Sequence, residues 1–215
     1  MDPLRLRLYT PRAELHVPQA DDAPALLDYH LRNREHLALW APPRPPAYYT
    51  LLHWERRIPR WQAEVRSGLA IWLALREREA PAGPAGAGGP GHRGDRGDRI
   101  IGHCHLFHIL RGPQQCCHLG YGLDREEVGQ GLMSEAVREV VRFAFQELRL
   151  KRVVANHDPD NVRSARLLAR AGFAVEGRAC EALYTADGWR DLVVTALANP
   201  DASRVGLPEE LGGAA

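Results

Sequence analysis

A glycine-bearing turn between a strand pattern and a helix pattern is the segment best suited to chemistry. It runs from Leu119 to Met133, and Gly129 and Gly131 stand directly before an apolar repeat. Glycine lets successive backbone N–H groups converge on one point, and a helix N-terminus adds unpaired N–H groups and partial positive charge. Such a turn can bind a pyrophosphate. On glycine spacing alone, a tight turn that binds no ligand stays an open alternative.

The elements that must position this turn follow from the apolar pattern of the second half of the chain. Strands are predicted at about residues 100–109, 116–123, 152–156, 173–184 and 190–197, and helices at about 129–148 and 161–171. In the longer helix, Leu132, Ala136 and Val140 recur at four-residue spacing, which is typical of an amphipathic helix packed on a sheet. The mixture predicts an α/β protein with a mixed sheet flanked by helices.

The first half predicts helices with strands at their edges. A strand is expected at about residues 14–17, a helix from Asp21 or Asp22 to about 34, a helix from Thr50 to about 65, and a buried strand at 69–75. Residues 79–98 are rich in Gly, Pro, Ala and Arg, so we expect a flexible surface insertion there. We expect a single domain over residues 1–215, with its core at about 14–198 and a tail at 199–215.

The glycine turn resembles the signature of the GNAT superfamily of acyl-coenzyme A N-acyltransferases. That signature is Arg/Gln-x-x-Gly-x-Gly/Ala, and residues 126–131 read Glu-Glu-Val-Gly-Gln-Gly, so only Glu126 departs from it. Backbone amides would make most of the pyrophosphate contacts, so this departure weakens the motif without cancelling it. Residues 156–177 are similar to the next strand and helix of the superfamily, where the equivalent of Asn161 lies beside the cofactor.

Within the superfamily the sequence most resembles the RimJ and RimL ribosomal-protein N-terminal acetyltransferases, and RimJ more than RimL. The likeness spans about residues 14–198 and includes the segments 29–40, 119–121, 129–133 and 187–191. It implies a GNAT fold with a central, mostly antiparallel sheet, and acetyl-CoA as co-substrate. The implied acetyl-CoA-binding residues are Tyr121, Gly122, Leu123, Glu126, Glu127, Val128, Gly129, Gln130, Gly131, Leu132, Met133, Asn156, Asn161 and Ser164.

The usual acid and base of the superfamily are both missing. Many relatives carry a Glu on the strand that holds Asn156, and a Tyr at the position of Leu168. The resemblance to RimL implies instead that Ser164 donates a proton to the leaving thiolate. A hydroxyl that merely contacts backbone at a helix start is the alternative. RimL's base position falls near Leu183, which cannot accept a proton, so neighbouring Glu181 is the substitute candidate, with a solvated strand residue as its alternative reading.

A weak base favours one class of acceptor. An α-amino group has a pKa of about 7.7–8.0 against about 10.4 for lysine, so its deprotonation near neutral pH costs roughly 3 kcal/mol less. We therefore expect transfer to a protein N-terminus, and the resemblance implies a ribosomal protein, with the small subunit as the expected source. The alternatives are acetylation of a small amine, such as an antibiotic or a polyamine, and a non-catalytic regulator that binds acyl-CoA or a metal.

A histidine and cysteine cluster offers a rival chemistry. Its members lie on two adjoining strand patterns: His103, Cys104, His105, His108, Cys116, Cys117 and His118. Such side chains suit zinc, but strand alternation sends His103 and His105 to one face and Cys104 to the other. No Cys-x-x-Cys pair occurs, so we expect no metal cofactor.

Composition narrows the partners and the compartment. The 28 basic and 27 acidic residues give a formal net charge of +1, which argues against nucleic acid as the main ligand. No window resembles a signal peptide or a membrane span, so we expect a cytoplasmic protein without a membrane partner. Nothing in the sequence indicates the oligomeric state.

Overall fold

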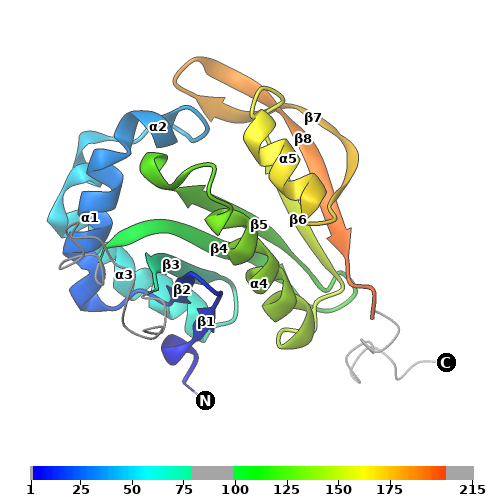
Figure 1. Cartoon of the computed structure of the whole chain (residues 1–215), viewed down its shortest axis with the longest axis horizontal. Helices are drawn as coiled ribbons and strands as arrows, with labels where there is room; N and C mark the ends of the chain where they lie inside the picture. Colours follow the sequence, from blue (N-terminus) through cyan, green and yellow to red (C-terminus); the bar gives the residue numbers. More distant parts are fainter. Residues whose placement is uncertain (1, 79–98, 202–215) are drawn as a thin grey trace, which may run out of the picture.

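The strands of the chain assemble into one sheet. The computed structural model describes residues 2–78 and 99–201, whose eight strands follow the order β1-β2-β3-β4-β5-β6-β8-β7 (Figure 1). The strands are β1 (Arg7–Tyr9), β2 (Ala13–His16), β3 (Ile71–Glu77), β4 (Ile100–Leu110), β5 (Cys116–Leu123), β6 (Arg152–His157), β7 (Ala174–Thr185) and β8 (Gly188–Ala198). The α-helices are α1 (Ala23–Arg32), α2 (Arg34–Ala38), α3 (Leu51–Arg66), α4 (Leu132–Gln146) and α5 (Val162–Arg170). Every strand pair is antiparallel except β5–β6, which confirms the predicted mixed, mostly antiparallel sheet.

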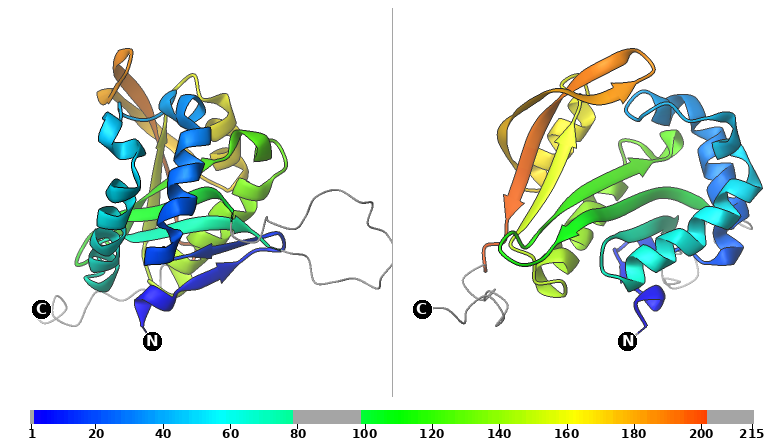
Figure 2. Two further views of the ribbon diagram at one scale, coloured as in Figure 1. Left: turned by 90° about the vertical axis from the view of Figure 1, so that its left-hand side faces the viewer. Right: turned by 180° about the vertical axis from the view of Figure 1, so that it is seen from behind.

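Different helices cover the two faces of the sheet, and they pack on alternate apolar residues of the central strands. Leu73 and Leu75 of β3 join the cluster that packs on α4, whereas Ala74 joins the cluster of α1 and α3. Ile101 and Ile100 of β4 divide in the same way. Because successive strand side chains point to opposite faces, α1 and α3 lie on one face and α4 on the other (Figure 2).

Two of the predicted helix boundaries differ from those of the structure. The first helix ends at Arg32, and a separate short helix, α2, follows Asn33. Helix α4 begins at Leu132 and not at Gly129, because Gly129 and Gly131 have φ of 92° and 85°, outside the helical region. Thr50 caps α3 as predicted, with its hydroxyl accepting from the His53 N–H at 3.4 Å.

The sheet opens in its middle. The parallel pair β5–β6 is matched only from Cys116 to His118 against Arg152 to Val154. Beyond that point β5 continues alongside β4, and β6 continues alongside β8, so the two strands diverge (Figure 2, right). Among the strands of the described residues, none pairs with the edge of β5 that faces this opening, so the backbone polar groups of that edge have no strand partner there.

The remaining sequence predictions fall partly outside the described residues. The insertion at 79–98 and most of the tail at 199–215 belong to that part, and the single-domain organisation stays a prediction. Within residues 2–78 and 99–201, the helices are too short or too polar to cross a membrane.

Candidate active site

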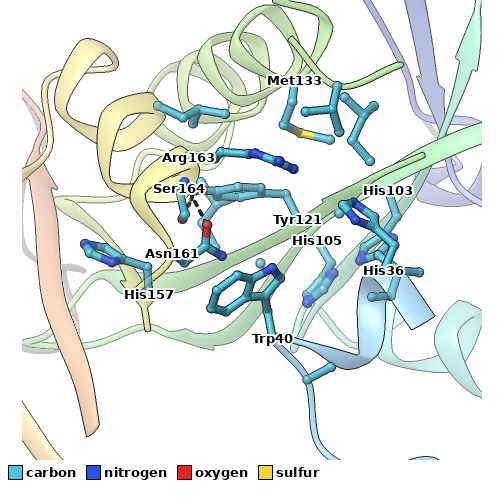
Figure 3. Close-up of a pocket in the computed structure, with 18 of the residues that line it drawn as sticks. His36, Trp40, His103, His105, Tyr121, Met133, His157, Asn161, Arg163 and Ser164 are labelled. Carbon is cyan, nitrogen blue, oxygen red and sulfur yellow. Dashed lines mark hydrogen bonds between the residues drawn. The ribbon is translucent and has the colours of Figure 1, made fainter. Parts of the chain in front are cut away.

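A cavity of about 1030 Å³ lies where β5 and β6 diverge. On one side its wall consists of the α4 N-terminus and α5, and on the other side it consists of the α1–α2 region and β4. Figure 3 shows Ser164 and Asn161 beside Tyr121, with His36, His103 and His105 toward the α1–α2 side. The cavity therefore reaches both faces of the sheet through the opening in its middle.

The alternation of β4 and β5 assigns these side chains to faces. Tyr121 pairs with Cys104, whose sulfur lies 3.5 Å from that of Met133 on α4, so Tyr121 shares the α4 face. His103 and His105 lie on the opposite face, where His103 Nδ1 is 3.3 Å from the Tyr29 hydroxyl of α1. Their rings cover the glycines of β5: a Cβ on Gly120 would lie 2.3 Å from His105, and one on Gly122 would lie 2.5 Å from His103.

The turn before α4 has the shape of an anion cradle. Asp124 caps a short 3-10 helix, Arg125–Glu127, and the chain then passes through the two left-handed glycines into α4. A Cβ on Gly129 would meet open space, and one on Gly131 would meet only the Arg12 guanidinium, at 3.3 Å. Open space above the backbone and a helix N-terminus together fit a pyrophosphate.

Most of the residues expected at the cofactor line this cavity. They are Tyr121, Gly122, Leu123, Val128, Gly129, Gly131, Met133, Asn156, Asn161 and Ser164. Four others, Glu126, Glu127, Gln130 and Leu132, lie in the turn but outside the cavity wall. Glu126 instead forms an ion pair with Arg99 at 2.8 Å, and Gln130 donates to the Glu127 carboxylate at 3.1 Å.

Ser164 and Tyr121 share a hydrogen bond across the cavity. Their oxygens are 2.7 Å apart, and either hydroxyl can be the donor. Asn161 caps α5, with its Oδ1 accepting from the Ser164 N–H at 3.1 Å, which holds the serine in place. Burial raises the pKa of Tyr121 to about 12, so this phenol keeps its proton at neutral pH. The sequence placed Tyr121 at the cofactor, but nothing in it indicated this pair.

Glu181 lies away from this pair. It is exposed on β7, with φ of 47°, and its backbone N–H donates to Asp191 at 2.8 Å. Leu183 and Leu192 from the β7–β8 hairpin line the cavity, whereas Glu181 does not. The structure gives no geometric support for Glu181 as the base.

Aromatic and histidine side chains form the α1–α3 side of the cavity. The rings of Trp72 and His105 stack with centroids 4.5 Å apart, and those of His105 and His103 with centroids 5.5 Å apart. Burial lowers the pKa of His103 to about 4, with a further contribution from Arg44, and lowers the pKa of His105 well below its ordinary value. Both imidazoles are neutral at pH 7. Trp40 also lines the cavity, while Trp189 is exposed on β8, so neither is a core residue.

The same histidines belong to the His and Cys cluster whose side chains could suit zinc. Within the described residues, no group of three or more His, Cys, Asp or Glu side chains is arranged to hold a metal ion. His103 and His105 stack against other rings, and Cys104 lies on the opposite face. The expectation that no metal is required stays a prediction.

Positively charged side chains outnumber negatively charged ones on the cavity wall. Seven arginines line it: Arg12, Arg34, Arg44, Arg138, Arg163, Arg166 and Arg170. Only two carboxylates do so among the described residues, and both are ion-paired: Glu135 with Arg12 at 2.6 Å and Asp158 with Arg190 at 2.9 Å. The site thus offers a hydroxyl pair as proton donor and a positive wall for anions, but no unpaired carboxylate as base.

Comparison with known proteins gives a family match and several similar proteins. The acetyltransferase (GNAT) domain model matches residues 12–174. The chain is 32% identical over 197 residues to the [ribosomal protein uS5]-alanine N-acetyltransferase of Escherichia coli K12, covering 92% of this chain and 93% of that protein.

Two solved structures are similar over nearly the whole chain. The ribosomal-protein-S5-alanine acetyltransferase of Vibrio fischeri has a TM-score of 0.80 at 29% identity, covering 91% of this chain and 98% of that one. The Mycobacterium smegmatis RimJ in complex with CoA-disulfide has a TM-score of 0.77 at 21% identity, covering 91% of this chain and 87% of that one.

Proposed function

This chain belongs to the GNAT family of acetyl-CoA-dependent N-acetyltransferases, and from that premise we propose that it acetylates the N-terminal α-amino group of a protein. The observation that carries the proposal is the cavity between β5 and β6. It joins an anion cradle on one face to a space on the other face that is lined, among the described residues, by no unpaired carboxylate. The uS5-alanine acetyltransferase relatives support a small-subunit ribosomal protein as the substrate.

The cradle is the proposed site for the pyrophosphate of acetyl-CoA. Backbone N–H groups at Gly129 to Met133 would bind its oxygens, because both glycines leave the approach open. Arg163, Arg166 and Arg170 project from one side of α5 into the same cavity and would balance the remaining phosphate charge. The unpaired edge of β5 at Leu119 to Leu123 would hold the extended arm of the co-substrate.

Ser164 and Tyr121 are the proposed proton donors. When the acceptor nitrogen bonds to the thioester carbon and the carbon–sulfur bond breaks, the leaving thiolate takes a proton. A Ser164 hydroxyl that gives up its proton can be resupplied by Tyr121 across the 2.7 Å hydrogen bond. The elevated pKa of Tyr121 keeps that second proton available at neutral pH.

The acceptor side compensates electrostatically for the missing base. Arg34 and Arg44 line it, and its histidines are neutral, so a bound ammonium group would face positive charge. Positive charge nearby lowers the pKa of an ammonium group and so favours its neutral, nucleophilic form. An α-amino group, with a pKa of about 7.7–8.0, needs only a modest shift, and water can accept its proton.

The same charges weigh against the polyamine alternative. Among the described residues, no carboxylate lines this part of the cavity beside Arg34 and Arg44. Each ammonium group of a polyamine would therefore be repelled by these arginines. An aminoglycoside antibiotic also carries several ammonium groups and is disfavoured in the same way, so both classes of small amine belong among the test substrates.

The test is acetyl transfer by the purified protein to a defined panel. The panel holds a peptide with a free N-terminus, the same peptide with a blocked N-terminus, spermidine, and an aminoglycoside. Release of the CoA thiol and mass spectrometry of the products report transfer. We expect acetylation of the free N-terminus alone. Acetylation of spermidine or the aminoglycoside with an unmodified peptide contradicts the proposal.

A further inference from the structure

A second cavity, of about 400 Å³, continues the first on the α1–α3 face. The two share His30, Arg44, Tyr48, His103 and His105 in their walls. Helix α3 and strands β3 and β4 supply most of the rest, and the volume lies in the range of ligand pockets. An acceptor that reaches the Tyr121–Ser164 pair from this face can therefore extend part of its chain into the second cavity.

Two arginines give this cavity its charge. Arg44 lies over the Tyr48 ring at 4.7 Å, and Arg57 lies over Trp61 and Trp72 at 5.4 Å and 5.7 Å. In the described part of the chain, neither forms an ion pair, and no Asp or Glu lines the cavity. Glu64 lies outside its wall and accepts from the Trp72 indole at 2.6 Å.

The histidines of the cavity carry no charge that would replace the arginines. Burial lowers the pKa of His30 to about 2, and the pKa of His53 is also lowered, first by burial and then by Arg57 and Arg44. The second cavity is therefore lined by neutral aromatic and histidine rings, and the two guanidinium groups supply its positive charge.

The indole N–H groups of two tryptophans also favour a ligand that accepts hydrogen bonds. Trp54 and Trp61 both line the cavity, and their indole N–H groups have no acceptor within the described residues. An indole N–H can only donate. Arginine and indole donors together complement a ligand that accepts hydrogen bonds and carries negative charge, such as a carboxylate.

The phosphates of acetyl-CoA do not account for Arg44 and Arg57, because their proposed cradle lies on the α4 face. We propose that the second cavity is a specificity subsite for an acidic side chain, Asp or Glu, within the first few residues of the acceptor protein, bound by Arg44 and Arg57. This inference rests on the proposed function, since it presumes a protein N-terminus as acceptor.

The experiment uses the full chain, acetyl-CoA, and peptides that differ at one position. A glutamate is moved through positions two, three and four of an otherwise neutral peptide beginning with alanine, and matched peptides carry Gln or Lys there. We expect one position at which Glu raises kcat/KM about tenfold over Gln, which corresponds to about 1.4 kcal/mol, with Lys the poorest. The preference should shrink with added salt.

Variants of Arg44 and Arg57 test whether these two residues cause the preference for Glu peptides. Arg57→Gln and Arg44→Gln should each reduce the Glu preference severalfold through KM, whereas Arg57→Lys should keep most of it. Arg60→Gln is the matched control, because Arg60 is exposed on the same helix and lines neither cavity. Melting curves and the KM for acetyl-CoA show that each variant is folded and binds its co-substrate.

The outcomes separate the two proposals. Equal kcat/KM for the Glu, Gln and Lys peptides, or a Glu preference that survives Arg44→Gln and Arg57→Gln together, overturns the subsite and leaves N-terminal acetylation standing. If none of the peptides is acetylated while a small amine is, the proposed function itself fails.

Discussion

The two faces of the sheet at the β5–β6 opening are built in different ways. The α4 face takes its anion cradle from one continuous turn, Asp124 to Met133, and its proton donor from the start of α5. The opposite face takes its wall from α1, α2, α3, β3 and β4, which are spread over residues 23–110. A site made of backbone groups on one turn leaves a local sequence motif, whereas a site made of distant side chains leaves none.

The faces also use charge differently. On the α4 face, Arg12 is bound to Glu135 and lies over the cradle. On the other face, Arg44 and Arg57 lie over aromatic rings and form no ion pair with a described residue. The comparison leads to separable expectations: substitutions on the α4 face should change cofactor binding or turnover, and those on the α1–α3 face should change acceptor selectivity.

The largest expected effect comes from the hydroxyl pair that stands between the two faces. Ser164→Ala should lower kcat by about 10²–10⁴-fold, because general-acid help matters in the transition state, while the affinity for acetyl-CoA stays nearly unchanged. Tyr121→Phe should also lower kcat, and the double variant should lose less than the product of the two effects, because the residues act as a pair.

Steady-state kinetics and a melting curve check this prediction. Ser67→Ala, which removes an exposed hydroxyl at the end of α3, is the control and should behave like the wild type. Unchanged turnover in folded Ser164→Ala would reduce Ser164 to a residue of the α5 N-terminus and leave the acid unassigned.

A substitution in the cradle should affect the α4 face alone. Gly131→Asp adds a side chain and a negative charge where the pyrophosphate must approach, so we expect about 100-fold weaker acetyl-CoA binding, or about 2.7 kcal/mol, by calorimetry. Gly68→Asp is the matched control for backbone strain, because Gly68 has φ of 70°, has open space around its Cβ and lines neither cavity. Equal affinity in wild type and folded Gly131→Asp argues against the cradle.

Asp124 connects the two faces, so its loss should affect the stability of the fold. Its buried carboxylate accepts from Arg32 of α1 at 2.7 Å and from Arg99 at 3.0 Å, next to the cradle turn. Asp124→Asn should lower the free energy of unfolding by about 3 kcal/mol, because Arg32 and Arg99 lose the buried carboxylate that they share. Asp28→Asn, which removes an exposed partner of the same Arg32, should cost less than about 1 kcal/mol.

The contribution of Asp124 to the stability of the fold should decrease at low pH. Burial alone would raise its pKa, but hydrogen bonds from Arg32 and the Glu126 N–H hold the pKa below its ordinary value. A carboxylate with a depressed folded pKa stabilises the fold above its unfolded pKa of about 3.9, and this contribution is lost as the pH falls through the folded pKa. The stability gap between wild type and Asp124→Asn, measured by denaturant unfolding, should therefore begin to shrink below about pH 4 and close once the pH lies below the folded pKa. A gap that persists there would mean that the charge of Asp124 is not its source.

The smallest effect is expected where neither face is involved. Residues 79–98 lie outside the described chain, but β3 and β4 on either side of them are paired, with Arg76 opposite Ile100. Replacing them with a short Gly-Ser link should change the free energy of unfolding by less than about 0.5 kcal/mol and leave the KM for acetyl-CoA intact. A large fall in melting temperature would show that the segment packs on the fold.

Most of the fold could be predicted from the sequence, because short sequence patterns indicate its strands and helices. Apolar runs and periodicity identified the central strands and α3 to α5, and the mixed sheet followed from their order. Strand β1, three residues long, gave too short a pattern to detect. The predicted helix start at Gly129 was wrong, because the left-handed glycines that shape the cradle also delay α4.

Only the α4 face of the candidate site could be predicted from the sequence. Gly129, Gly131, Asn161 and Ser164 followed from the resemblance to the GNAT superfamily and line one cavity. His105, Trp72 and Arg57 lie on three different elements, β4, β3 and α3, so their contact depends on how α3 packs across the two strands, which sequence spacing does not indicate. Glu181 was selected as the polar neighbour of a leucine, and that criterion cannot tell whether the side chain faces the cavity.

The most direct test of this two-sided account is the structure of the protein bound to CoA joined through its sulfur, by an acetyl bridge, to the α-amino group of a short peptide. The account predicts the pyrophosphate on the backbone of Gly129 to Met133, the bridge between β5 and β6 beside Tyr121 and Ser164, and the peptide against His103 and His105. A peptide that leaves along α4 or α5, on the same face as the CoA, would contradict it.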